Sequence, residues 1–113
     1  MIKAAICRKF ERDNGLSYTP AQVTVGSGGK QVLYNALSIL LNAGDRVAVP
    51  APYWVTYPAQ VAALRGDVIT VQPSQGWKVT PDDLERAGAG AARALILNSP
   101  SNPTGTVYSR DEL

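Results

Sequence analysis

Residues 94–105 of the chain read ALILNSPSNPTG, an apolar run that passes directly into a dense turn segment. Four consecutive apolar residues, 94–97, predict a strand that is covered on both faces of a sheet. The residues that follow include Pro100, Pro103 and Gly105, which are typical of turns. Open α/β sheets bind ligands beyond the carboxyl ends of their strands, so this turn is a candidate binding segment.

The same alternation extends toward the N-terminus. Three further apolar or β-branched runs predict strands, at 23–25, 46–49 and 68–71. Apolar residues at helical spacing predict helices over 2–14, 30–41, 54–64 and 80–87, and Ser109 begins a last helical turn. Thr80, Pro81 and an acid at 83 form a helix-capping pattern, and the acids of that turn are expected on a solvated face. The alternation predicts an α/β fold with a mainly parallel sheet.

Composition excludes several classes of function. The 113 residues carry 11 Lys+Arg and 9 Asp+Glu, a net charge of +2, which favours neither nucleic acid nor an anionic membrane as a partner. No apolar stretch is long enough to span a bilayer, and the charged N-terminus does not resemble a signal peptide, so a cytoplasmic location is expected. One cysteine and no histidine exclude an internal disulfide and a Ser-His or Cys-His couple, and we expect no metal site.

The first candidate site is Gly26-Ser27-Gly28-Gly29-Lys30, which opens a predicted helix. Glycines allow the backbone to close on an anion, and a helix N-terminus offers N–H groups to a phosphate. Gln31 breaks both the dinucleotide fingerprint and the Walker loop. A tight turn that binds nothing explains the loop equally well.

Two more candidates follow predicted strands. Pro52-Tyr53-Trp54 and the aromatic residues after it could face a planar ligand, although aromatic packing in the core is the more common arrangement. Asn102-Pro103 could present a side-chain amide to a ligand oxygen, or form an ordinary β-turn. Each candidate is weak alone, but all three would lie at one edge of the expected sheet.

Together these residues resemble the class I and II aminotransferases, the fold-type I pyridoxal-phosphate enzymes, and especially the aspartate/aromatic aminotransferase group. The similarity runs along the whole chain and is carried by Lys9-Phe10, Asn14-Gly15-Leu16, Gly28-Gly29-Lys30-Gln31, Ala43-Gly44-Asp45, Pro52-Tyr53-Trp54-Val55 and Asn98-Ser99-Pro100-Ser101-Asn102-Pro103-Thr104-Gly105. It implies that residues 1–113 are part of one large cofactor-binding domain, a three-layer fold with helices on both faces of the sheet, with no second domain.

The resemblance also implies roles for individual residues. Gly28, Gly29 and Lys30 would bind the phosphate of pyridoxal 5′-phosphate; Trp54 would stack on its ring and help to bind the substrate carboxylate; Asn102 would bond its 3-hydroxyl and lie near that carboxylate. Cis peptide bonds are expected before Pro52 and Pro103. The implied reaction transfers an amino group between an amino acid, aspartate or an aromatic one, and a 2-oxo acid, in a homodimeric enzyme.

The resemblance leaves part of that machinery outside the chain. None of the four lysines lies in the family's lysine motif, so no catalytic residue is assigned and the Schiff-base lysine is expected beyond Leu113. The chain is therefore expected to be an internal piece of the domain, inactive in transamination by itself. Two alternatives remain: a non-catalytic module for cofactor or phosphate binding or for dimerisation, and a piece of a related fold-type I lyase.

Overall fold

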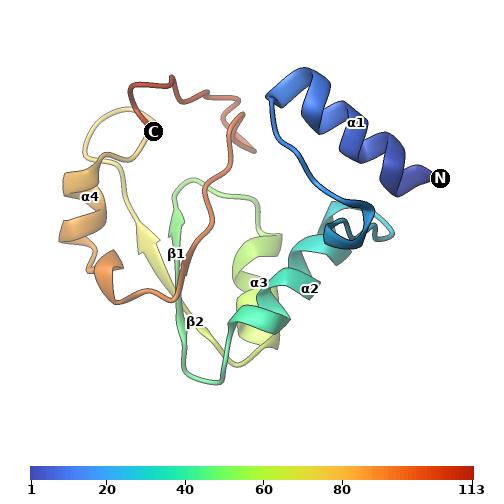
Figure 1. Ribbon diagram of the computed structural model, residues 1–113. Coiled ribbons are helices and arrows are strands. Elements are labelled where there is room, and N and C mark those ends of the chain that lie inside the picture. Colours follow the sequence, from blue (N-terminus) through green and yellow to red (C-terminus); the bar gives the residue numbers. More distant parts are fainter. The chain divides into compact units, whose positions relative to one another are not determined.

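The computed structural model describes residues 1–113 as two compact units, Met1–Asn35 and Ala36–Leu113 (Figure 1). None of the helices combines the length and the apolarity that spanning a bilayer requires.

The first unit is helical. Helix α1 (Ile2–Asn14) ends at Gly15, whose left-handed backbone (φ 65°) lets its N–H bond to the carbonyl of Glu11 and confirms the predicted stop. A short 3-10 turn, η1 (Pro20–Gln22), follows, and helix α2 (Gly29–Leu40) begins at the glycine-rich loop.

The strand predicted at 23–25 is wrong. Val23 is buried and has an extended backbone (φ −108°, ψ 125°), but this segment pairs with no strand. β-branched residues favour an extended backbone, yet a ladder also needs a partner with free N–H and C=O groups. Within the first unit the other elements are helices, so the segment stays extended and unpaired.

The second unit contains a parallel sheet in the order β2-β1-β3. Strand β1 (Arg46–Pro50) pairs over its whole length with β2 (Asp67–Val71), and on its other side with β3 (Ala94–Leu95). The strands predicted at 46–49 and 68–71 are confirmed, and so is the parallel α/β architecture.

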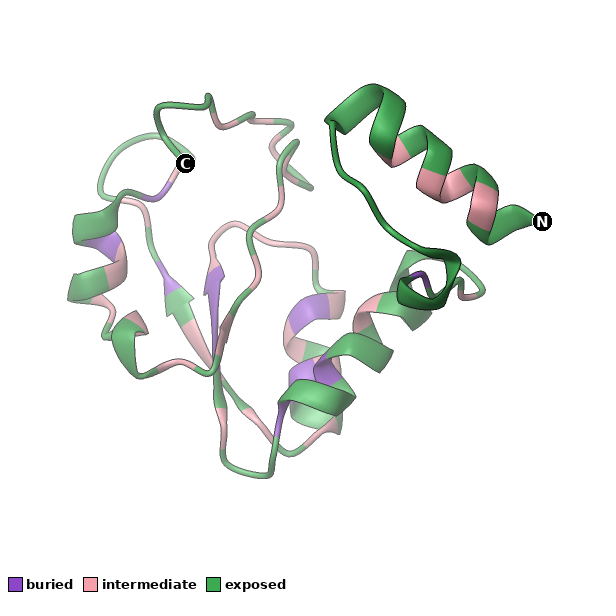
Figure 2. Ribbon diagram, viewed as in Figure 1, coloured by how far each residue is buried: buried purple, intermediate pink, exposed green.

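Helices cover the two faces of this sheet. On one face Ala48, Val71 and Val79 form a buried cluster against α4 (Pro81–Arg86) and the 3-10 turn η2 (Ala89–Ala91). Val47 and Val49 alternate with Ala48 and therefore point to the opposite face, on the side of α3 (Thr56–Ala63). Figure 2 shows the buried residues concentrated on β1 and on the helix turns nearest to it. The middle of β1, at most 1% exposed, is the centre of the core.

Three details differ from the sequence predictions. Strand β3 is short, and Leu95 and Leu97 are 46% and 38% exposed, so the prediction that this strand is covered on both faces is wrong. Helix α3 begins after Trp54, and Arg65 takes the left-handed conformation (φ 59°) at its end. Residues 110–112 form a single turn rather than a helix.

Candidate functional site

A narrow hollow with an enclosed volume of about 20 Å³, which opens to solvent, lies at the carboxyl ends of β1 and β3. Parallel neighbours end at the same edge of a sheet, so the loops that follow these two strands meet there. The hollow is lined by Val49, Pro50, Ala51, Pro52, Tyr53, Tyr57, Trp77, Ile96, Leu97, Asn98, Ser101, Asn102 and Tyr108.

The loop after β3, residues 98–108, is bonded mainly to itself. The N–H of Ser101 donates to the carbonyl of Thr106 (2.8 Å), and that of Gly105 to the carbonyl of Ser101 (2.7 Å). At its base the N–H of Tyr108 donates to Ser99 Oγ (3.1 Å). These bonds hold the loop as a narrow closed turn with Asn102 exposed at its tip.

The loop after β1 carries the aromatic candidates. Tyr53 lines the hollow, and its hydroxyl lies 3.3 Å from Thr70 Oγ1 of β2. Trp54 is half-buried and packs edge-to-face on Tyr57, with ring centroids 5.8 Å apart and an angle of 89°. Because Tyr57 is buried, this contact fixes the plane of the indole. The cis bonds expected before Pro52 and Pro103 are confirmed, and Ser99-Pro100 is cis as well.

The glycine-rich loop belongs to the first unit. Gly28 has φ +90°, a conformation that side chains of L-residues rarely adopt, and its N–H donates to the carbonyl of Gly26 (2.9 Å). The side chain of Gln31 accepts the N–H of Ser27 at 2.5 Å and closes the turn. A Cβ placed on Gly28 or Gly29 meets nothing within 4 Å, so the backbone at the start of α2 is open to a ligand.

The structure brings only some of the sequence candidates together. Asn102 and the Pro52-Tyr53 segment share the hollow, and Trp54 is adjacent to that segment without lining the hollow. Gly28, Gly29 and Lys30 belong to the first unit. Sequence reasoning missed Trp77 and Tyr108, which line the hollow from segments outside the motifs, and no local pattern marked them.

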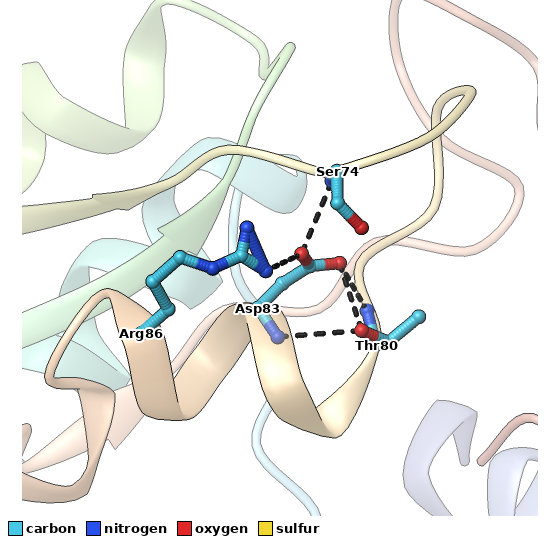
Figure 3. Close-up of polar contacts among 4 residues, drawn as sticks. All are labelled: Ser74, Thr80, Asp83 and Arg86. Carbon is cyan, nitrogen blue, oxygen red and sulfur yellow. Dashed lines mark hydrogen bonds and ion pairs between the residues drawn. The ribbon is translucent and has the colours of Figure 1, made fainter.

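A second polar cluster supports the loop that carries Trp77. Asp83, 1% exposed, accepts the N–H of Thr80 (2.8 Å), its hydroxyl (2.9 Å) and the N–H of Ser74 (3.1 Å), and it pairs with Arg86 (Figure 3). The predicted cap is confirmed, but the expectation that Asp83 lies on a solvated face is wrong. The bond from the Thr80 N–H is the main cause that lowers the pKa of Asp83 below its ordinary value.

An ion pair lies beside the Tyr108 ring. Lys78 pairs with Glu112, and its ammonium lies 6.0 Å from the centre of the Tyr108 ring. The Lys78 ammonium is the main cause that lowers the pKa of Glu112. No group of three or more His, Cys, Asp or Glu residues is placed to hold a metal ion.

Each unit offers its own kinds of contact. In the second unit the amide of Asn102 can donate and accept hydrogen bonds, and the indole of Trp54 presents a flat surface. In the first unit the N–H groups at the start of α2 can bind an anion.

Comparison with known proteins gives one consistent result. A family model described as aminotransferase class I and II matches residues 2–113. An aspartate/prephenate aminotransferase of Cereibacter sphaeroides is 57% identical over 114 residues, which cover 99% of this chain and 28% of that protein.

Solved structures agree with the sequence comparison. The aspartate aminotransferase of Rhizobium meliloti matches with a TM-score of 0.90 and 41% identity, over 98% of this chain and 28% of that one. An aspartate aminotransferase of Thermus thermophilus solved with maleate matches with a TM-score of 0.89 and 43% identity, over 97% and 29%. The chain spans less than a third of the length of these relatives. With a family model that matches nearly every residue, the chain belongs to the class I and II aminotransferases.

Proposed function

We propose that residues 1–113 form the part of a pyridoxal-phosphate-dependent aminotransferase that binds the cofactor. The observation that carries the proposal is the convergence of Asn102 with the Pro52-Tyr53 segment at the carboxyl ends of two neighbouring parallel strands. Both units would then belong to one large domain of the whole enzyme.

The residues present match the chemical groups of the cofactor. The open backbone at Gly28 and Gly29 suits a phosphate, and Lys30 adds a positive charge at that helix start. The indole of Trp54, held in one plane by Tyr57, suits stacking on a pyridine ring. The exposed amide of Asn102 suits a hydrogen bond to the ring hydroxyl and a position near the substrate carboxylate.

In such an enzyme the bound cofactor withdraws electrons from the Cα of the amino acid. This chain's residues would bind and orient the cofactor: the start of α2 would bind the phosphate, Trp54 would stack on the ring, and Asn102 would bond the ring hydroxyl. None of Lys3, Lys9, Lys30 or Lys78 is proposed to bind the cofactor covalently.

The substrates are proposed from the relatives. Relatives named aspartate/prephenate aminotransferase, together with an aspartate aminotransferase solved with maleate, favour a dicarboxylic amino acid such as aspartate as the amino donor and a 2-oxo acid such as prephenate as the acceptor. We extend the proposal to a homodimeric enzyme of the cytoplasm.

The first test is binding. The full chain should bind pyridoxal 5′-phosphate more tightly than pyridoxal, because only the phosphate can accept hydrogen bonds from the N–H groups at the start of α2. Asn102→Ala should weaken that binding, whereas Asn14→Ala, which removes an exposed amide at the end of α1, should not. Equal affinities for both compounds, or equal behaviour of both variants, would contradict the proposed roles.

The second test is catalysis. In a chimera, the chain replaces the 114 aligned residues of the Cereibacter enzyme. The chimera should transfer the amino group of aspartate to a 2-oxo acid such as prephenate, and Asn102→Ala within it should lower kcat/KM. A folded chimera that binds the cofactor and does not transaminate would refute the assignment of the reaction while leaving cofactor binding intact.

A further inference from the structure

We propose that Tyr108 is a positioning residue for Asn102: its hydroxyl fixes the returning end of the 98–108 loop on the backbone of Val79. This inference rests on the proposed function only in its final step, the effect on the cofactor. The positioning itself is a property of the chain.

The internal hydrogen bonds of the 98–108 loop define its conformation but do not fix its position relative to the sheet, so other contacts must fix that position. The bonds between Ser101 and Thr106 and between Gly105 and Ser101 move together with the loop. Its entering end is held by the sheet, since the N–H of Ile96 donates to the carbonyl of Ala48 at 3.0 Å. One fixed end would still allow the tip to swing.

Tyr108 supplies the second fixed point. Its hydroxyl accepts the N–H of Val79 at 2.8 Å, and Val79 is buried. The Tyr108 ring packs against the cluster of Ala48, Val71 and Val79, which is the core on the α4 face of the sheet. The returning end is thereby fixed both by packing and by a directed hydrogen bond to a buried donor.

The same residue also closes the base of the loop. The Tyr108 N–H donates to Ser99 Oγ, so the two ends of the loop are joined at the point where the hydroxyl holds one of them. Asn102 lies at the tip of the loop, away from the base that Ser99 and Tyr108 close. A small rotation of Tyr108 would displace the Asn102 amide relative to Tyr53 and Pro52 on the opposite wall of the hollow.

Tyr108→Phe tests the directed bond. It keeps the ring and its packing, and it leaves the buried N–H of Val79 without its acceptor. We expect faster amide hydrogen exchange at position 108, whose N–H bonds Ser99 Oγ at the anchored base of the loop, and a dissociation constant for pyridoxal 5′-phosphate about threefold or more higher, as for coupled residues of one network. Glu112→Gln is the matched control: it breaks the ion pair with Lys78 beside the same ring and should change neither quantity.

A double-mutant cycle separates positioning from general destabilisation. If Tyr108 acts through Asn102, Tyr108→Phe should not weaken cofactor binding further in an Asn102→Ala background. The unpaired N–H of Val79 should lower the melting temperature in both backgrounds. An additive loss of affinity, or unchanged exchange of the position-108 amide, would overturn the inference. If the unaltered chain does not bind the cofactor, the proposed function fails, and the exchange measurement alone decides the role of Tyr108.

Discussion

Gly66 lies in the connection between α3 and β2, and the added methyl group of Gly66→Ala should measurably destabilise the sheet. Its N–H donates to the carbonyl of Val61 at 3.0 Å. A Cβ added to Gly66 would lie 2.9 Å from the carbonyl oxygen of Asp45 and 3.1 Å from Cγ1 of Val61. The Asp45 oxygen also accepts the N–H of Asp67 at 2.9 Å, so it cannot retreat without lengthening the bond that begins the β1–β2 pairing.

Two opposing terms set the size of the effect of Gly66→Ala. Overpacking against a well-packed neighbour costs about 1–3 kcal/mol. Gly66 does not have a left-handed φ, so alanine also lowers the entropy of the unfolded chain, which stabilises by about 0.4–1 kcal/mol. Taking the middle of each range, the net expectation is a loss of about 1.3 kcal/mol in the free energy of unfolding. For a chain of this size that is a fall of about 4–8 °C in melting temperature.

Gly90→Ala is the matched control. Gly90 has no left-handed φ, and a Cβ there meets nothing within 4 Å, so only the entropy term applies and the free energy of unfolding should stay equal or rise slightly. Urea titration followed by circular dichroism measures both variants against the parent chain. If Gly66→Ala proves as stable as Gly90→Ala, the close approach of Gly66 to Asp45 is not the constraint that the geometry indicates.

Three further predictions follow from single features of the chain. Gly28→Ala places a side chain on a backbone with φ +90°, a conformation that L-residues rarely adopt, so the loop backbone should shift and binding of pyridoxal 5′-phosphate should weaken. The helix content measured by circular dichroism should stay the same, since the added methyl group meets no neighbour within 4 Å. The bonds from Thr80 and Ser74 lower the pKa of Asp83, so its carboxylate stabilises the fold above about pH 4, and this contribution is lost as the pH falls through the lowered folded pKa; Asp83→Asn should flatten the acid limb of a stability-against-pH curve. Glu112→Gln should leave the urea midpoint unchanged, at low and at high salt, because both partners of its ion pair are solvent-exposed.

Features that depend on a few consecutive residues could be predicted from the sequence. Thr80 and Asp83 form their reciprocal cap because the two side chains are three positions apart on the first turn of α4. Gly15 ends α1 because it can adopt a left-handed backbone. The strand at 46–49 follows from its own apolar residues, which the sheet buries almost completely.

Features that depend on distant partners could not be predicted. Val23 is extended as its composition favours, but pairing needs a neighbouring strand that the segment cannot specify. Asp83 looked like a surface charge because the Ser74 backbone that covers it lies nine positions away in a loop. Tyr108 lines the hollow, and its hydroxyl bonds to Val79, which lies 29 positions away in the sequence. In each case the deciding contact is absent from the local pattern.

The candidate site depends most on the register of β1, the least local feature of all. Beyond the end of β1, the N–H of Ala51 still donates to the carbonyl of Val71 at 2.9 Å, and on the other side Ile96 bonds to Ala48. These two bonds fix the points at which the Tyr53 loop and the Asn102 loop leave the sheet. A slip of one residue in β1 would exchange Ala48 with its larger neighbours on the α4 face and shift one wall of the hollow against the other. The packing that forbids this slip therefore also sets the separation between the two loops, so stability of the β1 core and alignment of the proposed binding residues are one physical requirement.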